Sequence, residues 1–190
     1  ETTSVVLVGV GGQGILLASE IVAQAAMTAG FDVKTNEVHG MAQRGGSVVA
    51  QIRYGKEVFS PLVNKGAARV LGALERIEAM RYADYLAPDG LTVVNSQIIM
   101  PVTVSMGAAK YPDDAEAKLR DQFPRLIYFD AAAKAIEMGN IRVANVILLG
   151  ALSTGLDLPL DAWHAAVANC VKAQYRDLNV QAFEVGRTLA

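Results

Sequence analysis

The chain has 190 residues, a hydrophobic share of 52% and a net charge of −2 at pH 7, from 17 basic and 19 acidic residues. This length is ample for one domain with a large core. Without a basic tract or a basic–aromatic stripe, the sequence argues against nucleic acid as a partner. No apolar run reaches the ~18 residues of a membrane span, and no signal peptide is evident, so we expect a cytoplasmic protein with no membrane partner.

The cysteine content limits the chemistry of the chain. Cys170 is the single cysteine, which excludes an internal disulfide and leaves no group of thiolates for an iron–sulfur centre or a structural zinc. We therefore expect no metal site on this chain.

The chain is also apolar for a globular protein. Its apolar share is roughly 58% when glycine is counted and tyrosine is not, against the usual ~45–50% on that residue set. Either alanine-rich helices or an additional face buried against a partner accounts for this excess.

The first predicted element is a strand that runs directly into a glycine cluster. Residues 5–8 are apolar and mostly β-branched, and Gly9, Gly11 and Gly14 follow with the spacing G-x-G-x-x-G. Apolar positions with a helical period come next, which predicts strand, tight turn and helix. The start of that helix offers backbone N–H groups to a phosphate or carboxylate. The candidate cofactor- or anion-binding residues are Gly9, Gly11, Gly12, Gln13 and Gly14.

A second strand is predicted at residues 31–37, where apolar and polar side chains alternate after the helix-ending Gly30. Glu37 closes this strand about 23 residues after Gly14. Dinucleotide-binding folds place an acid near this position, on the ribose hydroxyls. Glu37 is therefore a further candidate cofactor-binding residue, and NAD or FAD binding is a hypothesis to weigh.

A glycine-rich loop without hydrophobic period follows at residues 38–47. It places His39, Gln43 and Arg44 at the carboxyl end of a strand, where open α/β sheets hold their ligands. A titratable ring, an amide and a fixed cation make these three the catalytic candidates. The alternative is structural, with His39 and Arg44 capping carbonyl groups or pairing with Glu37.

The remaining chain alternates between strands and helices. Residues 47–54, then Gly55-Lys56 and residues 57–59, predict a strand, a turn and a short returning strand, hence a β-hairpin. Further strands are expected at residues 68–73, 91–95, 102–104 and 125–130, with a turn at residues 88–90. Helices are expected at residues 74–82, 113–122, 131–138, 141–152, 160–175 and 179–189.

This alternation predicts the α/β class: a mainly parallel, Rossmann-like doubly wound sheet with a β-hairpin insertion and C-terminal helices. No repeat or linker divides the chain, so residues 1–190 are expected to form a single domain. Asn145 is the one amide in the apolar stretch 141–152, and we expect it to be a satisfied polar group of the core or an interface. Trp163, His164 and Cys170 are expected to be packing or surface residues.

Two stretches together carry a resemblance to a known family. G-V-G-G-Q-G at residues 9–14 and E-V-H-G-M-A-Q-R-G-G-S-V at residues 37–48 resemble the gamma-type domain of the 2-oxoacid:ferredoxin oxidoreductases. Within that family the chain is most similar to indolepyruvate ferredoxin oxidoreductase beta subunits. The likeness extends over nearly the whole chain, through residues 52–55, 75–82, 104–107 and 139–152.

The resemblance implies one subunit of a heteromeric enzyme. Such enzymes decarboxylate an aryl or other 2-oxoacid in a thiamine-dependent reaction, attach the acyl unit to coenzyme A and pass electrons to ferredoxin. Thiamine diphosphate, magnesium and the iron–sulfur clusters would lie on the alpha subunit. This chain would be the non-cluster subunit, without a cofactor of its own and inactive by itself.

The resemblance also changes the interpretation of the site. The glycine turn is not an established NAD site in that family, which weakens the ribose role of Glu37. Residues 9–14 and 39–46 would instead form the rim of a crevice that docks on the thiamine-bearing subunit and touches coenzyme A or the substrate. The alternatives are a gamma subunit serving pyruvate, 2-oxoglutarate or branched-chain 2-oxoacids, a free-standing dinucleotide-binding protein, and a scaffold whose glycine loops only permit close packing.

Overall fold

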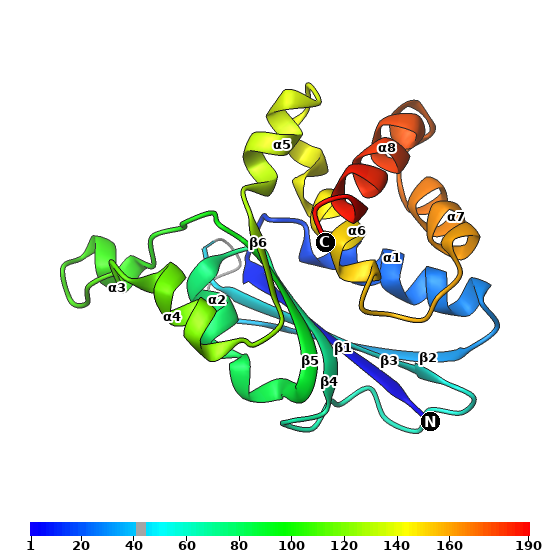
Figure 1. Ribbon diagram of the computed structural model, residues 1–190, viewed down its shortest axis with the longest axis horizontal. Helices are drawn as coiled ribbons and strands as arrows, with labels where there is room; N and C mark the ends of the chain where they lie inside the picture. The colour runs from blue at the N-terminus through cyan, green and yellow to red at the C-terminus, as the bar shows by residue number, and fades with distance from the viewer. Residues whose placement is uncertain (41–44) are drawn as a thin grey trace.

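The structure, a computed structural model, describes residues 1–40 and 45–190 and is built on a six-stranded sheet (Figure 1). The strand order is β2-β3-β1-β4-β5-β6. The strands are β1 (Thr3–Val10), β2 (Asp32–His39), β3 (Ser47–Gly55), β4 (Ala68–Ala73), β5 (Leu86–Asn95) and β6 (Leu126–Phe129). β1, β4, β5 and β6 run parallel, whereas β3 pairs antiparallel with both β1 and β2.

Helices cover both faces of the sheet (Figure 1). The face that we call the α6 face carries α1 (Ile15–Thr28), α5 (Ala131–Glu137), α6 (Ala144–Ser153), α7 (Leu160–Cys170) and α8 (Arg176–Arg187). The opposite face, called the α2 face, carries α2 (Arg76–Arg81), α3 (Val102–Ser105) and α4 (Ala115–Gln122). The predicted α/β class, with a mainly parallel sheet and C-terminal helices, is therefore confirmed.

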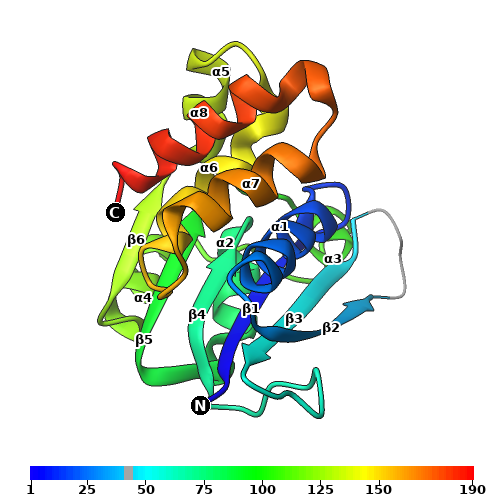
Figure 2. The ribbon, with the colours of Figure 1, turned by 90° about the vertical axis from the view of Figure 1, so that its right-hand side faces the viewer.

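The α6 face is closed by apolar packing of helix on helix. α6 is buried along its length. α1 lies on β1 and β3, and α7 packs beside α1 (Figure 2). α6 and α8 touch through glycine, because a Cβ on Gly186 would lie 1.9 Å from the carbonyl oxygen of Ile147. Trp163 is fully buried and stacks on Phe183, with ring centroids 5.5 Å apart. The packing role expected for Trp163 is confirmed.

The hairpin prediction is right about an antiparallel pair but wrong about which strands form it. Residues 57–59 form no strand. β3 instead pairs with β2 on one side and with β1 on the other. Since both edges of β3 are filled, no edge is left on it for a strand returning after Gly55. The backbone N–H of Val58 is bonded instead to the Asp32 carboxylate at 2.8 Å.

Two other local predictions are wrong for related reasons. Residues 88–90, expected as a turn, lie within β5, where the register against β4 shifts between Ala68 and Val70. Residues 102–104, expected as an edge strand, form one helical turn, α3, that begins after Pro101. The Pro101 carbonyl accepts N–H bonds from Val104 and Ser105. The position beside β5 is filled by β6, which pairs with it in parallel.

The C-terminal helices differ from expectation in length. The predicted helix 160–175 ends at Cys170, and Ala173–Tyr175 form a separate 3-10 turn before α8. The predicted helix 141–152 starts with a 3-10 turn at Ile141–Val143. Within residues 1–40 and 45–190, no helix combines the length and apolar character needed to cross a bilayer.

Candidate functional site

A crevice of about 450 Å³ opens at the edge of the sheet where the parallel strands β1, β4 and β5 end. This is the edge at which open α/β sheets place their ligands. The glycine turn after β1 forms one wall, and the start of α6 forms another. The lining residues are Gly12, Gln13, Gly14, Leu17, Leu74, Asn95, Gln97, Ile141, Arg142, Ala144 and Asn145.

Each glycine of the turn has a distinct structural reason. Gly12 and Gly14 have φ values of 97° and 84°, a left-handed conformation that side chains with a Cβ rarely adopt. Gly9 lies where a Cβ would come within 2.9 Å of the Ile15 side chain, so it lets α1 approach β1. The Gly11 N–H donates to the Gly46 carbonyl at 2.9 Å. The turn is thus fixed to the loop that precedes β3.

Gln13 fastens the turn to the neighbouring strands. Its Oε1 accepts the backbone N–H of Val10 at 2.8 Å, and its Nε2 donates to the Leu74 carbonyl at 2.7 Å. The same nitrogen is 3.2 Å from Gln97 Oε1. Asn95 Nδ2 also donates to the Leu74 carbonyl, at 3.2 Å. The crevice floor is therefore a set of mutually bonded neutral amides.

Asn145 closes the crevice from the side of α6. Its Nδ2 donates to the Gly14 carbonyl at 3.2 Å, across 131 positions of sequence, and its Oδ1 accepts the N–H of Val146. A Cβ on Gly14 would lie 2.5 Å from Asn145 Nδ2, so this contact also needs glycine at that position. Asn145 is buried and bonded, which confirms the expectation of a satisfied polar group.

The electrostatics of the crevice favour an anion. Its lining residues include no carboxylate, and Arg142 is the charged residue among them. The first turn of α1 carries no acidic residue. The unpaired N–H groups at the start of a helix of this length carry partial positive charge. Together with Arg142, this environment suits a phosphate or carboxylate.

His39 lies on the other side of the glycine turn. A second hollow of about 420 Å³ is lined by His39, Val48 and residues of the turn and of the start of α1. The structure therefore brings His39 and the glycine turn together. His39 is exposed at the end of β2, opposite Val48. Its catalytic role stays a prediction.

The other predicted site residues are not gathered at this place. Glu37 is exposed on the edge strand β2, with β3 between it and β1. It is not among the residues that line either hollow, and the geometry gives no support to a ribose contact. Gln43 and Arg44 lie outside the described residues.

The base of the loop after β2 is anchored on the α2 face. Ser47 Oγ donates to Glu78 Oε2 at 2.6 Å and lies 3.1 Å from the Tyr82 hydroxyl. The Gly40 N–H donates to the Ser47 carbonyl at 2.7 Å. Glu78 is only 4% exposed, and this burial raises the pKa of its carboxyl group, opposed by the Ser47 bond and by Arg81. A buried carboxylate thus holds the loop base.

Glu75 is a second buried carboxylate, one turn earlier. It caps α2 by accepting the Glu78 N–H at 3.0 Å, and its Oε1 accepts the Tyr111 hydroxyl at 2.8 Å and the Ile99 N–H at 3.4 Å. Burial raises the pKa of Tyr111 to about 12, with the Arg76 contact opposing the shift. Glu75 therefore joins α2 to the segment that follows β5.

Sequence reasoning missed Asn95, Gln97 and Arg142 as site residues. Asn95 had a usable signal, because it is a polar residue at the end of the apolar run of β5. Gln97 and Arg142 had none, since both stand in irregular or short segments whose position depends on the tertiary fold.

Comparison with known proteins gives consistent full-length matches. The model of the pyruvate ferredoxin/flavodoxin oxidoreductase family matches residues 4–189. The indolepyruvate oxidoreductase subunit IorB of Pyrococcus horikoshii is 43% identical over 188 residues, covering 96% of this chain and 93% of that protein. IorB of Archaeoglobus fulgidus is 42% identical, with 96% and 92% covered.

Solved structures share the fold. The gamma subunit of a keto/oxoacid ferredoxin oxidoreductase from Geobacter sulfurreducens superposes with a TM-score of 0.73 at 23% identity, covering 99% of this chain and 98% of that one. A 2-oxoglutarate:ferredoxin oxidoreductase from Magnetococcus marinus gives a TM-score of 0.72 at 20% identity and covers 100% of this chain. The match is 31% of that longer chain, whose structure holds 2-oxoglutarate, coenzyme A and succinyl-CoA.

Proposed function

The chain belongs to the pyruvate ferredoxin/flavodoxin oxidoreductase family, and from this premise we propose that it is the non-cluster subunit of an indolepyruvate (aryl pyruvate) ferredoxin oxidoreductase. Residues 1–190 form one gamma-type domain of that complex. The observation that carries the proposal is the 43% identity with an indolepyruvate oxidoreductase subunit over 96% of this chain. Gamma subunits named for pyruvate and ketoisovalerate are only 25% identical, which favours the aryl substrate.

The complex divides the chemistry between subunits. The alpha subunit holds thiamine diphosphate, magnesium and the iron–sulfur clusters, decarboxylates the 2-oxoacid and passes electrons to ferredoxin. One cysteine cannot supply the four thiolates of such a cluster, which supports placing the clusters elsewhere. This chain contributes the amide-lined crevice at the ends of β1, β4 and β5.

The crevice binds an anionic group of coenzyme A or of the 2-oxoacid. Arg142 at its rim and the start of α1 favour negative charge. In the assembled complex, Arg142→Ala should weaken binding of the true ligand by about tenfold, the effect of one charge-assisted hydrogen bond. Titration with coenzyme A and with indolepyruvate distinguishes the two candidate ligands. The ligand whose dissociation constant changes is the one that the crevice binds. If neither constant changes, the crevice does not bind an anion.

His39 is the remaining catalytic candidate within the described residues. His39→Ala should lower turnover of the complex without dissociating it, and the matched change at exposed Val38, Val38→Ala, should not. Unchanged turnover in His39→Ala would assign the loop to packing alone. Arg44 and Gln43 lie outside the described residues, and Arg44→Ala is tested in the same assay.

Co-purification tests the subunit assignment itself. A tagged chain, purified without oxygen from its native cells, should bring down a larger subunit containing thiamine diphosphate and iron–sulfur clusters. A chain that purifies alone, or that binds NAD or FAD tightly and reduces a substrate unaided, would overturn the proposal.

A further inference from the structure

The amides of the crevice floor have a fixed orientation, which follows from two backbone N–H groups. The Val10 N–H donates to Gln13 Oε1 at 2.8 Å, and the Ala131 N–H donates to Asn95 Oδ1 at 3.0 Å. Because a backbone N–H can only donate, the side-chain atom that it meets in each case is the oxygen. Gln13 and Asn95 therefore direct their NH₂ groups to their other neighbours.

Gln97 is the last amide of this set. Gln13 Nε2 lies 3.2 Å from the Gln97 amide and Asn95 Nδ2 lies 3.4 Å from it, and both approach the same atom. Two donors converge on that atom, so it is the acceptor Oε1. Both side-chain bonds of Gln97 to the described residues are thus made by Oε1. Its Nε2, with two N–H bonds, is the end of the amide that the floor leaves available.

The available donor belongs to the crevice. Gln97 is exposed and lines it, and so does Arg142, which is also exposed. Asn95, which holds the Gln97 oxygen, is only 1% exposed and is fixed by the backbone of Ala131. The orientation of the Gln97 amide is therefore set before a ligand arrives, which lowers the entropic cost of binding one.

We propose that Gln97 is a ligand-binding residue of the crevice, whose Nε2 donates to an oxygen of the anionic group that Arg142 attracts. The inference rests on the proposed function and deepens it by naming the donor and the chemical class that the donor selects. That class is an oxyanion, which only accepts hydrogen bonds, such as the carboxylate of a 2-oxoacid or a phosphate of coenzyme A. A neutral amide that turned its own N–H toward Gln97 would leave donors facing each other and would be rejected.

Gln97→Glu tests the proposal with little change of shape. One carboxylate oxygen still accepts from Gln13 and Asn95, so the floor is retained, whereas the other replaces the donor with a negatively charged acceptor. In the assembled complex, the dissociation constant of the bound ligand should rise about 100-fold, from the lost hydrogen bond to a charged group and the new repulsion. Separate titrations with coenzyme A and with indolepyruvate show which of the two supplies the anion.

Gln97→Ala separates ligand binding from support of the floor. It removes the donor without adding a charge, so the dissociation constant should rise only about tenfold. A residue that merely supported the floor would give the opposite order, because alanine removes the acceptor of both amide bonds and glutamate keeps it. Thermal melting of both variants, expected close to that of the wild type, distinguishes loss of the ligand from loss of the fold.

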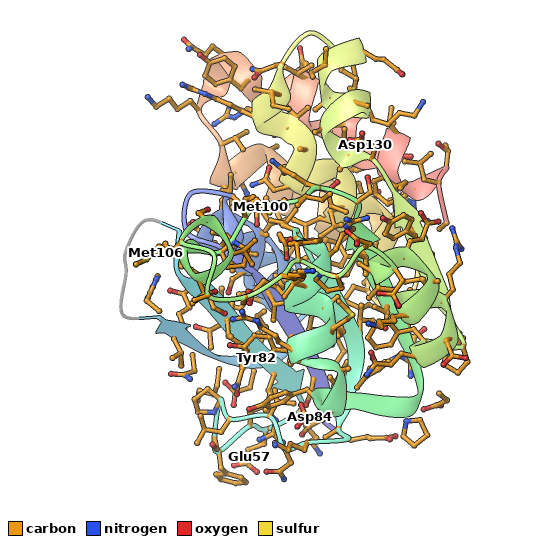
Figure 3. All side chains as sticks on the ribbon, turned by 90° about the vertical axis from the view of Figure 1, so that its left-hand side faces the viewer. Glu57, Tyr82, Asp84, Met100, Met106 and Asp130 are labelled. Atoms are coloured by element: carbon orange, nitrogen blue, oxygen red, sulfur yellow. The ribbon has the colours of Figure 1, made fainter. Side chains whose placement is uncertain are left out.

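Gln122→Glu is the matched control for the change of charge. Gln122 is exposed at the end of α4, shortly before β6 begins, and so lies at the opposite edge of the sheet from the crevice. Figure 3 shows the two ends of the molecule: Asp130, directly after β6, marks the end with the crevice, and Glu57 and Asp84 mark the other. This control should bind both ligands like the wild type.

The outcomes distinguish this inference from the proposed function. If Arg142→Ala weakens binding but Gln97→Glu does not, or if Gln97→Ala weakens it more than Gln97→Glu, the inference is overturned and the proposed function stands. If none of these variants changes either dissociation constant, the crevice binds no anion and the inference fails with that part of the proposed function. If the chain assembles with no thiamine-bearing subunit, both fail.

Discussion

The α6 face of the sheet is closed by apolar side chains and by glycines that let helices touch, whereas the α2 face buries Glu75 and Glu78 beneath the segments that border the crevice. The first arrangement gains stability from close packing. The second removes two carboxylates from water, which is unfavourable. Hydrogen bonds offset this cost and fix the loop base at Ser47 and the segment after β5 at Ile99. The difference indicates that the α6 face is held together by apolar packing, and the α2 face by hydrogen bonds to buried carboxylates.

The largest expected effect is on the α6 face. In Gly186→Ala the new methyl group would meet the Ile147 backbone oxygen, so α6 and α8 must separate. We expect a loss of about 3 kcal/mol in the free energy of unfolding, at the upper end for overpacking, and a fall of roughly 6–12 °C in the melting temperature. Gly155→Ala is the matched control, because its methyl group meets only side-chain atoms of Leu91 and Val70. Equal losses in both would contradict the backbone contact.

A smaller effect is expected where the two faces meet at the crevice. Gln13→Ala removes the bonds to the Val10 N–H and the Leu74 carbonyl. Because two backbone groups lose their partners, the free energy of unfolding measured in urea should fall by about 2 kcal/mol. Gln97→Ala removes an exposed amide that accepts bonds only from other side chains in this cluster, and it should cost less than about 1 kcal/mol. A larger loss for Gln97→Ala than for Gln13→Ala would contradict the role of Gln13 in fastening the turn.

The α2 face should show its buried charge in the pH dependence of stability. Burial raises the pKa of Glu78 above 4.5, so the folded state takes up a proton more readily than the unfolded state. Wild type should therefore lose stability relative to Glu78→Gln as the pH rises from about 4.5 through the raised pKa. Urea midpoints at several pH values up to about pH 7.5 check this. Glu57→Gln controls for the loss of a surface charge. If the urea midpoints of Glu78→Gln and wild type change with pH in parallel, the prediction is contradicted.

The last prediction concerns the reactivity of Cys170 on the α6 face and involves no change in the free energy of unfolding. Burial raises the pKa of Cys170 from 9.0 to about 11, with Glu20 adding to the shift. At about pH 8 the thiolate fraction is then about 100-fold lower than for a thiol without that shift, and alkylation by iodoacetamide should slow by a similar factor. Unfolding in urea should restore ordinary reactivity. Fast alkylation of the folded chain would contradict this account of the α7 end.

The sequence predicts the crevice wall well, because the information is local. Gly12 and Gly14 occupy left-handed positions, and the apolar run before them and the helical period after them are explicit in residues 5–25. The strands 68–73 and 125–130 are likewise found near β4 and β6. Local periodicity therefore yields most of the parallel sheet.

The errors arise where tertiary structure decides. Whether residues 57–59 or 102–104 become strands depends on a neighbouring strand to pair with, and β3 is already paired with β2 and β1, as β5 is with β4 and β6. The bond from Asn145 to Gly14 spans 131 positions and has no local signal. Glu75, the N-cap of α2, and Glu78, within α2, are buried although they are polar. Their burial is understandable only from their bonds to Tyr111 and Ser47, which are distant in sequence.

Ferredoxin reduction by the reconstituted enzyme tests the central claim most directly. The purified alpha subunit, supplied with indolepyruvate, coenzyme A and ferredoxin, is assayed with and without this chain. If the chain is the non-cluster subunit that completes the site, reduction should be fast with both subunits and should fall to background with either one alone. Equal rates with and without this chain would contradict the account.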